Sequence, residues 1–197
     1  MTQFSKKLDA LLDAAAAMFR ERGYDGVSLN EVAERLNISK PTVYHYVQSK
    51  DDLLIQIKLR AQKDILKDMR AIVGAPGTAR EKLRAIMISY AMLMSSDYGA
   101  CMLIVNWKNI DSQAEVDVGT EAGNKLIYAL LDEGIEDGSL RYEDRTVAFY
   151  TLFGSLNWIS FWFRAGARLS AQDMAELQVD LLLNGIRGDT PAADETR

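Results

Sequence analysis

One short segment, residues 40–46, offers an ammonium group, a hydroxyl, two phenols and an imidazole within seven positions. The side chains are those of Lys40, Thr42, Tyr44, His45 and Tyr46. All of them can hydrogen-bond to phosphate oxygens or to base edges. Three basic residues, Arg35, Lys40 and Lys50, follow one another here with no acidic residue between them. DNA affinity depends on phosphates that are neutralised locally, so the formal net charge of -5 does not exclude double-stranded DNA as a partner.

The residues around this segment predict two short helices joined by a tight turn. Ser28 and Glu31 have the spacing of a capping box and predict the start of the first helix, which ends at Asn37. Ser39 predicts the cap of the second helix, with Pro41 in its first turn, where a missing N–H breaks no hydrogen bond of the helix. This is a helix-turn-helix arrangement, in which the N-terminal residues of the second helix enter the major groove.

Helical periodicity dominates the rest of the chain, and no strand pattern competes with it. A first helix is expected from about residue 4 to 22, ending at Gly23, and Ser49 with Asp52 predicts a capping box for a long fourth helix that runs toward Gly74. Later helices are expected at about 78–94, 114–137, 144–164 and 170–186. We therefore predict an all-α fold with a three-helix DNA-binding domain at 1–50, a helical ligand-binding and dimerisation domain at 51–188, and a disordered tail at 189–197.

Composition argues against several other classes of protein. Cys101 is the only cysteine, so no intrachain disulfide can form and the cytoplasm is the expected location. With His45 as the only histidine, we expect no metal site, and nothing indicates a cofactor. We expect no signal peptide, because Asp9 and Asp13 interrupt the first apolar residues, and we expect no membrane span, because no apolar run is long enough. An enzyme is the rival hypothesis, but its candidate acids, Glu121, Asp132 and Glu133, lie on a helix with a polar side and no nucleophile and base pair is evident.

Aromatic and methionine side chains are frequent after residue 86, and they can form a large adaptable apolar surface. We expect a pocket for a small hydrophobic ligand among them, although a well-filled core is the alternative for each residue. The candidates are Met87, Tyr90, Met94, Trp107, Tyr128, Phe149, Trp158, Phe161 and Trp162.

The last two expected helices carry more apolar residues than one core contact needs. One explanation is a homodimer in which these helices form a four-helix bundle with their copies, and a pocket is the other explanation. The residues available for the bundle are Phe149, Phe153, Leu156, Leu181 and Leu182.

Residues 4–54 resemble the TetR family of bacterial transcriptional regulators. The resemblance lies in Gly23-Tyr24, the Ser28 cap, the segment SKPTVY at 39–44 and the segment SKDDLL at 49–54. It implies a homodimeric repressor that leaves its operator when a ligand fills the C-terminal domain. Carried over to this chain, it places Lys40, Pro41 and either Tyr44 or His45 near bases, and Ser28, Thr42, Tyr46 and Lys50 at phosphates. Many members have His-Phe at 46–47, where this chain has Tyr-Val, which leaves open whether His45 and Tyr46 exchange roles.

A second resemblance lies at residues 157–170, where Asn-Trp, an aromatic run, Arg, Gly and Arg-Leu-Ser follow one another. This pattern is similar to TetR-family regulators of lipid, sterol and aromatic-acid degradation, several of which sense acyl-CoA thioesters. Ala165 and Ala167 stand where Pro and Gly are common. Arg164 and Arg168 would suit an apolar ligand with phosphates or a carboxylate. Their alternative is a surface pairing with Asp173 or with a helix C-terminus. The resemblance thus implies an acyl-CoA thioester or a related acid as ligand, and the sequence leaves open whether the protein represses or activates.

Overall fold

A computed structural model describes residues 3–104, 110–164, 166 and 168–186 of the chain. The predicted tail at 189–197 lies outside these residues. Within them, every regular element is a helix, as the periodicity predicts. The helices are α1 (Gln3–Arg22), α2 (Leu29–Arg35), α3 (Lys40–Tyr44), α4 (Lys50–Val73), α5 (Ala79–Ser95), α6 (Asp97–Met102), α7 (Ile110–Glu136), α8 (Arg145–Asn157), α9 (Ile159–Trp162) and α10 (Ala171–Asn184).

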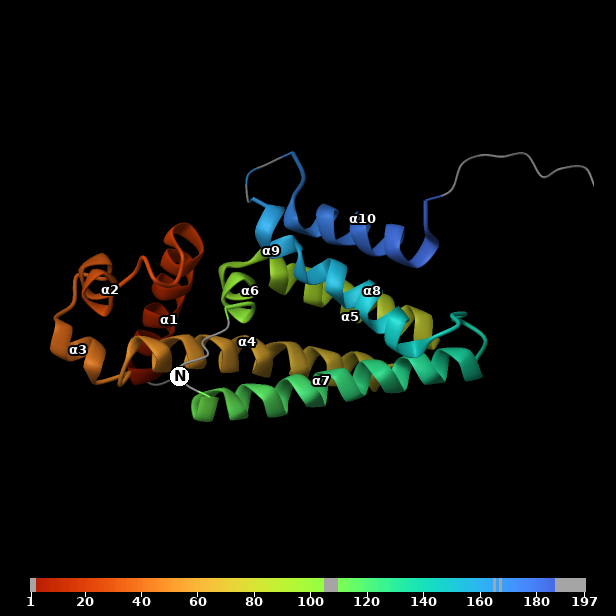
Figure 1. Ribbon diagram of the computed structural model, residues 1–197, viewed down its shortest axis with the longest axis horizontal. Helices are drawn as coiled ribbons and strands as arrows, with labels where there is room; N and C mark the ends of the chain where they lie inside the picture. The colour runs from red at the N-terminus through yellow and green to blue at the C-terminus, as the bar shows by residue number, and fades with distance from the viewer. Residues whose placement is uncertain (1–2, 105–109, 165, 167, 187–197) are drawn as a thin grey trace, which may run out of the picture.

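Helices α1 to α3 form a small head at one end of the molecule (Figure 1). Ser28 and Glu31 make the predicted capping box, and the Ser39 side chain accepts a hydrogen bond from the backbone N–H of Thr42. Gly23 has a φ of 75° and Asn37 a φ of 51°, so both lie in the left-handed region that glycine and asparagine tolerate best. The predicted helix ends at these two positions are therefore confirmed.

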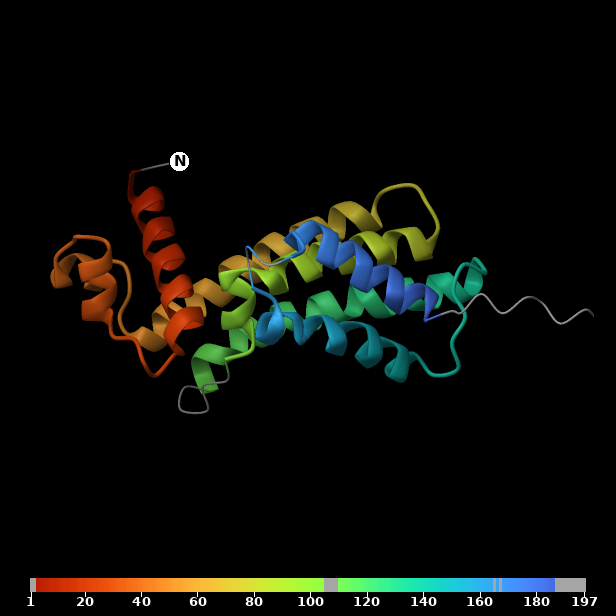
Figure 2. The ribbon, with the colours of Figure 1, turned by 90° about the horizontal axis from the view of Figure 1, so that it is seen from above.

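Helix α4 connects the head with the body of the protein, and it runs along the body beside α7 (Figures 1 and 2). Its first half contributes Leu53, Leu54 and Ile57 to the hydrophobic core of the head, whereas Ile65 and Met69 belong to the core of the body. One continuous helix thus joins two separate cores. The cap at its start differs from the prediction, because the Asp52 carboxylate accepts from the backbone N–H of Gln48, two residues before the helix.

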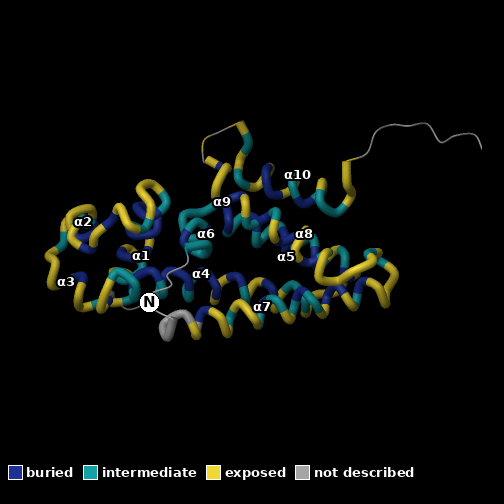
Figure 3. Tube along the Cα trace, in the orientation of Figure 1, coloured by how far each residue is buried: buried dark blue, intermediate teal, exposed yellow. Residues whose placement is uncertain are grey.

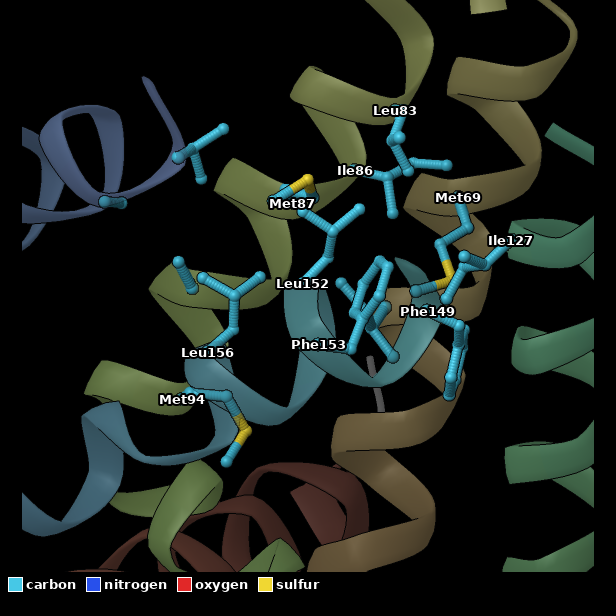
Figure 4. Close-up of a cluster of buried hydrophobic side chains, with 14 of the residues drawn as sticks. Met69, Leu83, Ile86, Met87, Met94, Ile127, Phe149, Leu152, Phe153 and Leu156 are labelled. Carbon is cyan, nitrogen blue, oxygen red and sulfur yellow. The ribbon is translucent and has the colours of Figure 1, made fainter. Parts of the chain in front are cut away.

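The body consists of α5 to α10 together with the second half of α4. Helices α5 and α8 lie between the α4–α7 pair and α10 (Figure 1). The dark-blue buried positions face inward along all of these helices, and exposed positions follow their outer sides (Figure 3). The side chains drawn in Figure 4, among them Leu83, Met87 and Leu156, are buried and pack together in this core.

The helix expected at residues 144–164 is two helices, α8 and α9, which meet at Trp158. Two hydrogen bonds lie at the break between these two helices. The Ser160 hydroxyl donates to the carbonyl of Asn157 at 3.1 Å, and the N–H of Phe161 donates to the carbonyl of Trp158 at 3.0 Å. Serine hydroxyls compete in this way with the regular backbone ladder. Helix α7 also begins earlier than expected, at Ile110.

Candidate nucleic-acid interface and ligand cavity

Helix α3 presents the predicted recognition side chains on the surface of the head. Lys40, Pro41, Tyr44 and His45 are exposed, whereas Thr42 is half-buried. The Thr42 hydroxyl lies 2.8 Å from the Ser39 hydroxyl, at the N-terminus of the helix. The short helix is held from below by Val43, which is fully buried in the core of the head.

The structure groups half of the predicted DNA-binding residues around one hollow of about 590 Å³. Ser28, Lys40, Tyr44 and Lys50 line it. Asn30 and Gln48 line it as well, and sequence reasoning did not select them. Their positions in the sequence could have indicated them, because each lies next to a helix cap. Asn30 follows the Ser28 cap by two residues, and Gln48 precedes the Ser49 cap by one.

His45 and Tyr46 belong to a separate aromatic group that includes Phe4 of α1. The ring centroid of Phe4 lies 5.8 Å from that of His45 and 4.8 Å from that of Tyr46. Phe4 is half exposed, so this group extends the surface of α3 toward the start of α1. Sequence reasoning placed Phe4 only at the start of a helix and did not connect it with this surface.

Of the three basic residues Arg35, Lys40 and Lys50, only Lys40 has neither an ion-pair nor a hydrogen-bond partner among the described residues. Arg35 lies 3.8 Å from Glu21, and the Lys50 ammonium group donates to the carbonyl of Tyr24 at 3.1 Å. Lys40 has no carboxylate partner among the residues that the structure describes, and its ammonium group lies 5.9 Å from the centre of the Tyr44 ring. A phosphate that meets Lys40 therefore has no internal acid to displace.

The capping carboxylate of Glu31 is held in its ionised form. Hydrogen bonds from the Arg22 guanidinium, and then from Ser28, lower the pKa of Glu31 to about 2. The Ser28 side chain is thus engaged in the cap at the start of α2, since its hydroxyl donates to the Glu31 carboxylate at 2.7 Å.

A cavity of about 250 Å³ lies inside the body between α4, α5, α7 and α8. Most of its lining is apolar, including Ile65, Met69 and Ile127. The side chains in its lining that carry a polar group are Gln62, Tyr90, Thr120, Asn124, Tyr150 and Asn157. An apolar cavity with a few placed polar groups is typical of small-molecule sites.

Two polar side chains face each other in the wall of this cavity. The Tyr90 hydroxyl lies 2.6 Å from the amide oxygen of Asn157. Burial raises the pKa of Tyr90 to about 12, so the phenol stays neutral. This pair offers a ligand neutral hydrogen-bonding groups and no charge.

The structure distributes the predicted ligand-binding residues between several places. Tyr90 and Phe149 line the cavity, and Tyr128 stacks on Phe149 with a centroid distance of 4.7 Å. Met87 and Met94 are fully buried in the core (Figure 4) and do not line the cavity. Trp107 lies outside the residues that the structure describes.

The remaining predicted residues lie on the surface near the end of α8 and beyond it. Trp158, Phe161 and Trp162 are about half exposed or more and do not line the cavity. Arg164 is exposed and donates to the carbonyl of Phe163 at 2.9 Å, and Arg168 is exposed. The structure therefore does not bring these residues together with Tyr90 and Phe149 in one site.

The outer faces of α8 and α10 carry exposed apolar side chains. A groove of about 790 Å³ between the two helices is lined by Trp158, Trp162, Leu177 and Leu181. Phe149, Phe153 and Leu156, which the sequence made available for a dimer interface, are buried in the protomer itself. An interface on α8 would use the opposite side of that helix.

The acids considered for an enzyme are engaged in ion pairs on α7. Glu121 pairs with Lys125, Asp132 with Arg145, and Glu133 with Lys82. None of the three lines the cavity. In the described part of the chain no cluster of three potential metal ligands occurs, and the helices described there include none that is long and apolar enough to cross a membrane.

Two family models match most of the chain. The model described as bacterial regulatory proteins of the tetR family matches residues 11–57. The model described as the tetracyclin repressor-like C-terminal domain matches residues 76–186, which is more than half of the chain. The first match covers the head with the start of α4, and the second covers the body from the α4–α5 loop onward.

Several known proteins are similar to this chain over nearly its whole length. The fatty acid metabolism regulator protein of Bacillus subtilis is 22% identical over 191 residues, 94% of this chain and 98% of that protein. The transcriptional repressor KstR2 of Mycobacterium tuberculosis is 24% identical over 190 residues, 93% of this chain and 94% of that protein. Each is a named regulator of metabolism or transcription.

Solved structures have the same fold. A TetR/AcrR-family transcriptional regulator from Thermobifida fusca superimposes with a TM-score of 0.71 at 28% identity, covering 93% of this chain and all of that one. AibR, solved in complex with isovaleryl coenzyme A and operator DNA, superimposes with a TM-score of 0.76 at 24% identity, covering 89% of this chain and 97% of that one.

Proposed function

This chain belongs to the TetR family of bacterial regulatory proteins, and from that premise we propose that it is a homodimeric repressor controlled by a small carbonyl-containing hydrophobic ligand. It is a DNA-binding transcriptional regulator by family. One observation carries the proposal for control: the cavity in the body and the core of the head share α4. A ligand that favours another position of α4 changes DNA affinity by its differential binding to the two states.

For DNA recognition we propose a division of labour along α3. Lys40, Pro41 and Tyr44 meet base edges or the adjoining phosphates, while Thr42 and Lys50 hold the backbone. The exposure of Lys40 and Tyr44 on one hollow supports this assignment. Ser28 contributes through its backbone position at the start of α2, because Glu31 engages its hydroxyl. His45 and Tyr46, which pack with Phe4, form the outer edge of the interface.

For the dimer we propose the outer faces of α8 and α10. Five exposed apolar residues support this choice, and they are Val147, Tyr150, Trp158, Leu177 and Leu181. Large exposed apolar patches mark protein interaction sites, and a twofold axis lets the same patch serve both protomers. The operator is then a pseudo-palindrome with half-sites about 34–36 Å apart.

For the ligand we propose a hydrophobic acid or its coenzyme A thioester. The fold accommodates such a ligand, because AibR, with the same fold, is solved with isovaleryl coenzyme A. The cavity of about 250 Å³ is smaller than the roughly 300–1,000 Å³ of drug-sized sites. It therefore suits a short acyl group, and the rest of a thioester would lie outside it. Arg164 and Arg168, exposed on the surface, are candidates for contacts with an anionic part of the ligand.

We propose binding and not catalysis for this cavity. The candidate acids Glu121, Asp132 and Glu133 are paired with cations outside it. The neutral pair of Tyr90 and Asn157 supplies hydrogen bonds but no activated nucleophile.

DNA selection from a random pool, followed by gel retardation with the recovered duplex, tests the DNA-binding part. We expect the double variant Lys40→Ala with Tyr44→Ala to weaken binding by about 100-fold or more, since each dimer loses four contacts. Lys67→Ala on the exposed side of α4 is the matched charge control and should stay within about twofold of the wild type. Undiminished binding by the double variant would refute the assignment of α3.

Thermal shift with two sets of compounds tests the ligand class. One set contains coenzyme A thioesters and free acids with short acyl groups, and the other contains sugars, amino acids and nucleotides. We expect stabilisation by a member of the first set, since a ligand of the folded state raises its stability by mass action. A clear response confined to the second set would rule out the proposed class.

A further inference from the structure

A buried amide side chain, that of Gln62, interrupts the apolar wall of the cavity. Gln62 lies on α4 and is only 5% exposed. Its amide nitrogen donates to the carbonyl of Val116 at 2.8 Å and to the hydroxyl of Thr120 at 3.0 Å, both on α7. The Thr120 hydroxyl itself donates to the same Val116 carbonyl at 3.0 Å. This cluster is a polar tie between α4 and α7 at the edge of the cavity.

Hydrogen-bonding chemistry determines how the Gln62 amide is oriented. A backbone carbonyl can only accept, so the group that faces Val116 is the NH₂ of the amide. The amide oxygen therefore points away from Val116, and it has no hydrogen-bond partner among the residues that the structure describes. Among the described residues only the Gln178 amide oxygen is fully buried without a partner, so the Gln62 oxygen is not sealed off, and a hydrogen-bond donor can reach it.

A glycine on α7 makes this arrangement possible. Gly119 lines the cavity next to Gln62, and a Cβ at position 119 would lie 2.1 Å from the amide oxygen and 2.3 Å from the amide carbon. The amide thus lies directly on the bare backbone of α7. Gly123, one turn later, also lines the cavity, but a Cβ there would make only ordinary contacts, 3.6 Å from Leu66 and 3.8 Å from Met69.

The position of α4 against α7 matters to the head, because α4 is built into the core of the head. Leu53, Leu54 and Ile57 of α4 are almost completely buried there. Figure 1 shows α4 and α7 side by side along the body. A change in the contact at Gln62 is therefore transmitted along one rigid helix.

We propose that Gln62 and Gly119 form a latch through which the ligand in the cavity acts on α4. A ligand carbonyl oxygen that accepts from the Gln62 NH₂ replaces the Val116 carbonyl and releases α4 from α7. A group that can only donate, and therefore bonds to the Gln62 oxygen alone, leaves the latch closed. A ligand oxygen that accepts from the Gln62 NH₂ opens it, as the carbonyl oxygen of an acid or thioester can. This inference rests on the proposed ligand-binding function of the cavity.

The variant Gly119→Ala tests the latch without any ligand, since its methyl group would lie 2.1 Å from the Gln62 amide oxygen and so forces the amide away from α7. Gly123→Ala is the matched control, because both changes replace a glycine of α7 by the better helix former. Two measurements compare them: hydrogen exchange of the α4 backbone, and affinity for the duplex that the wild type selects. Thermal melts verify that each variant is folded.

For Gly119→Ala we expect α4 to exchange about tenfold faster and the DNA affinity to fall about tenfold, the effect of roughly one lost hydrogen bond. Gly123→Ala should stay within about twofold of the wild type in both measurements. Gln62→Met, which keeps the length of the side chain but cannot bond to Val116, should behave like Gly119→Ala, and it decides the outcome if Gly119→Ala does not fold.

A double variant separates the latch from a simple backbone effect. In the background of Gln62→Ala, the methyl group of Gly119→Ala meets no amide and should change nothing further. The proposal is overturned if Gly119→Ala and Gly123→Ala are equivalent, or if Gly119→Ala keeps its full effect without Gln62. If the wild type selects no duplex, the proposed function fails, while the exchange of α4 still decides the latch.

Discussion

The side chain of Arg20 offers a quantitative test of how the head is attached to the body. Arg20 lies near the end of α1, and its side chain is 16% exposed. The guanidinium donates to the carbonyl of Ser95 at 2.7 Å, to the carboxylate of Asp97 at 3.3 Å and to the carbonyl of Phe163 at 3.0 Å. Ser95 ends α5 and Phe163 follows α9, so one cation serves two carbonyls at helix C-termini.

Arg20→Met keeps the apolar stem of the side chain and removes all three hydrogen bonds. Ser95 is buried, so its carbonyl is left without this donor at a cost of about 1–3 kcal/mol. The loss of the bond to the Phe163 carbonyl costs less free energy, because Arg164 still donates to that carbonyl. The bond to Asp97 adds roughly 0–1 kcal/mol, since that carboxylate is 45% exposed. We expect a total loss of about 2–3 kcal/mol, which lowers the Tm of a chain of this size by roughly 5–10 °C.

Urea and thermal unfolding, followed by circular dichroism at one protein concentration, measure this loss. Arg22→Met is the matched control, because Arg22 lies on the same helix but bonds only to Gly26 and Glu31, within the exposed part of the head. Its expected cost is below about 1 kcal/mol. If the two variants lose the same stability within about 0.5 kcal/mol, Arg20 does not attach the head to the body, and the reasoning from buried carbonyls is refuted.

Three further predictions concern titration, reactivity and assembly. A carboxyl NMR titration should show the pKa of Glu31, which is lowered from 4.5 to about 2. The stability that the ionised Glu31 contributes is present above pH 4.5 and is lost as the pH falls toward 2. The variant Arg22→Met should raise the pKa of Glu31, because it removes the largest cause of the shift. Burial raises the pKa of Cys101 to about 12, so thiol reagents should modify it slowly in the folded protein and quickly in urea, and equal rates would contradict its burial. Leu181→Glu should shift the protein from dimer to monomer in sedimentation, whereas Val118→Glu, which also changes an exposed apolar residue, should not; two dimeric variants would exclude the α8–α10 face.

Local signals in the sequence were sufficient for the head. Ser28, Ser39 and Ser49 accept hydrogen bonds from the N-termini of α2, α3 and α4, as their spacing predicts. Gly23 and Asn37 end helices in the left-handed conformation. These features depend on contacts within four residues along the chain, and such contacts can be read from the order of residue types.

The cavity could not be predicted in the same way. Helical periodicity marks Met87, Met94 and Trp158 as apolar positions, but it does not say what each face packs against. The tertiary structure places both methionines in the filled core and Trp158 on the surface, while Gln62 and Gly119, which no apolar pattern selects, line the cavity.

The sequence by itself determined the all-helical class, the ends of α1 and α2 and the residues of α3, because these follow from interactions local in the chain. Only the tertiary structure decided which apolar residues fill the core, which line the cavity and which face outward on α8 and α10. Whether a space stays open depends on the crossing of four helices from distant parts of the chain, α4, α5, α7 and α8. That crossing is set by the packing of all their side chains together, and no single segment contains it.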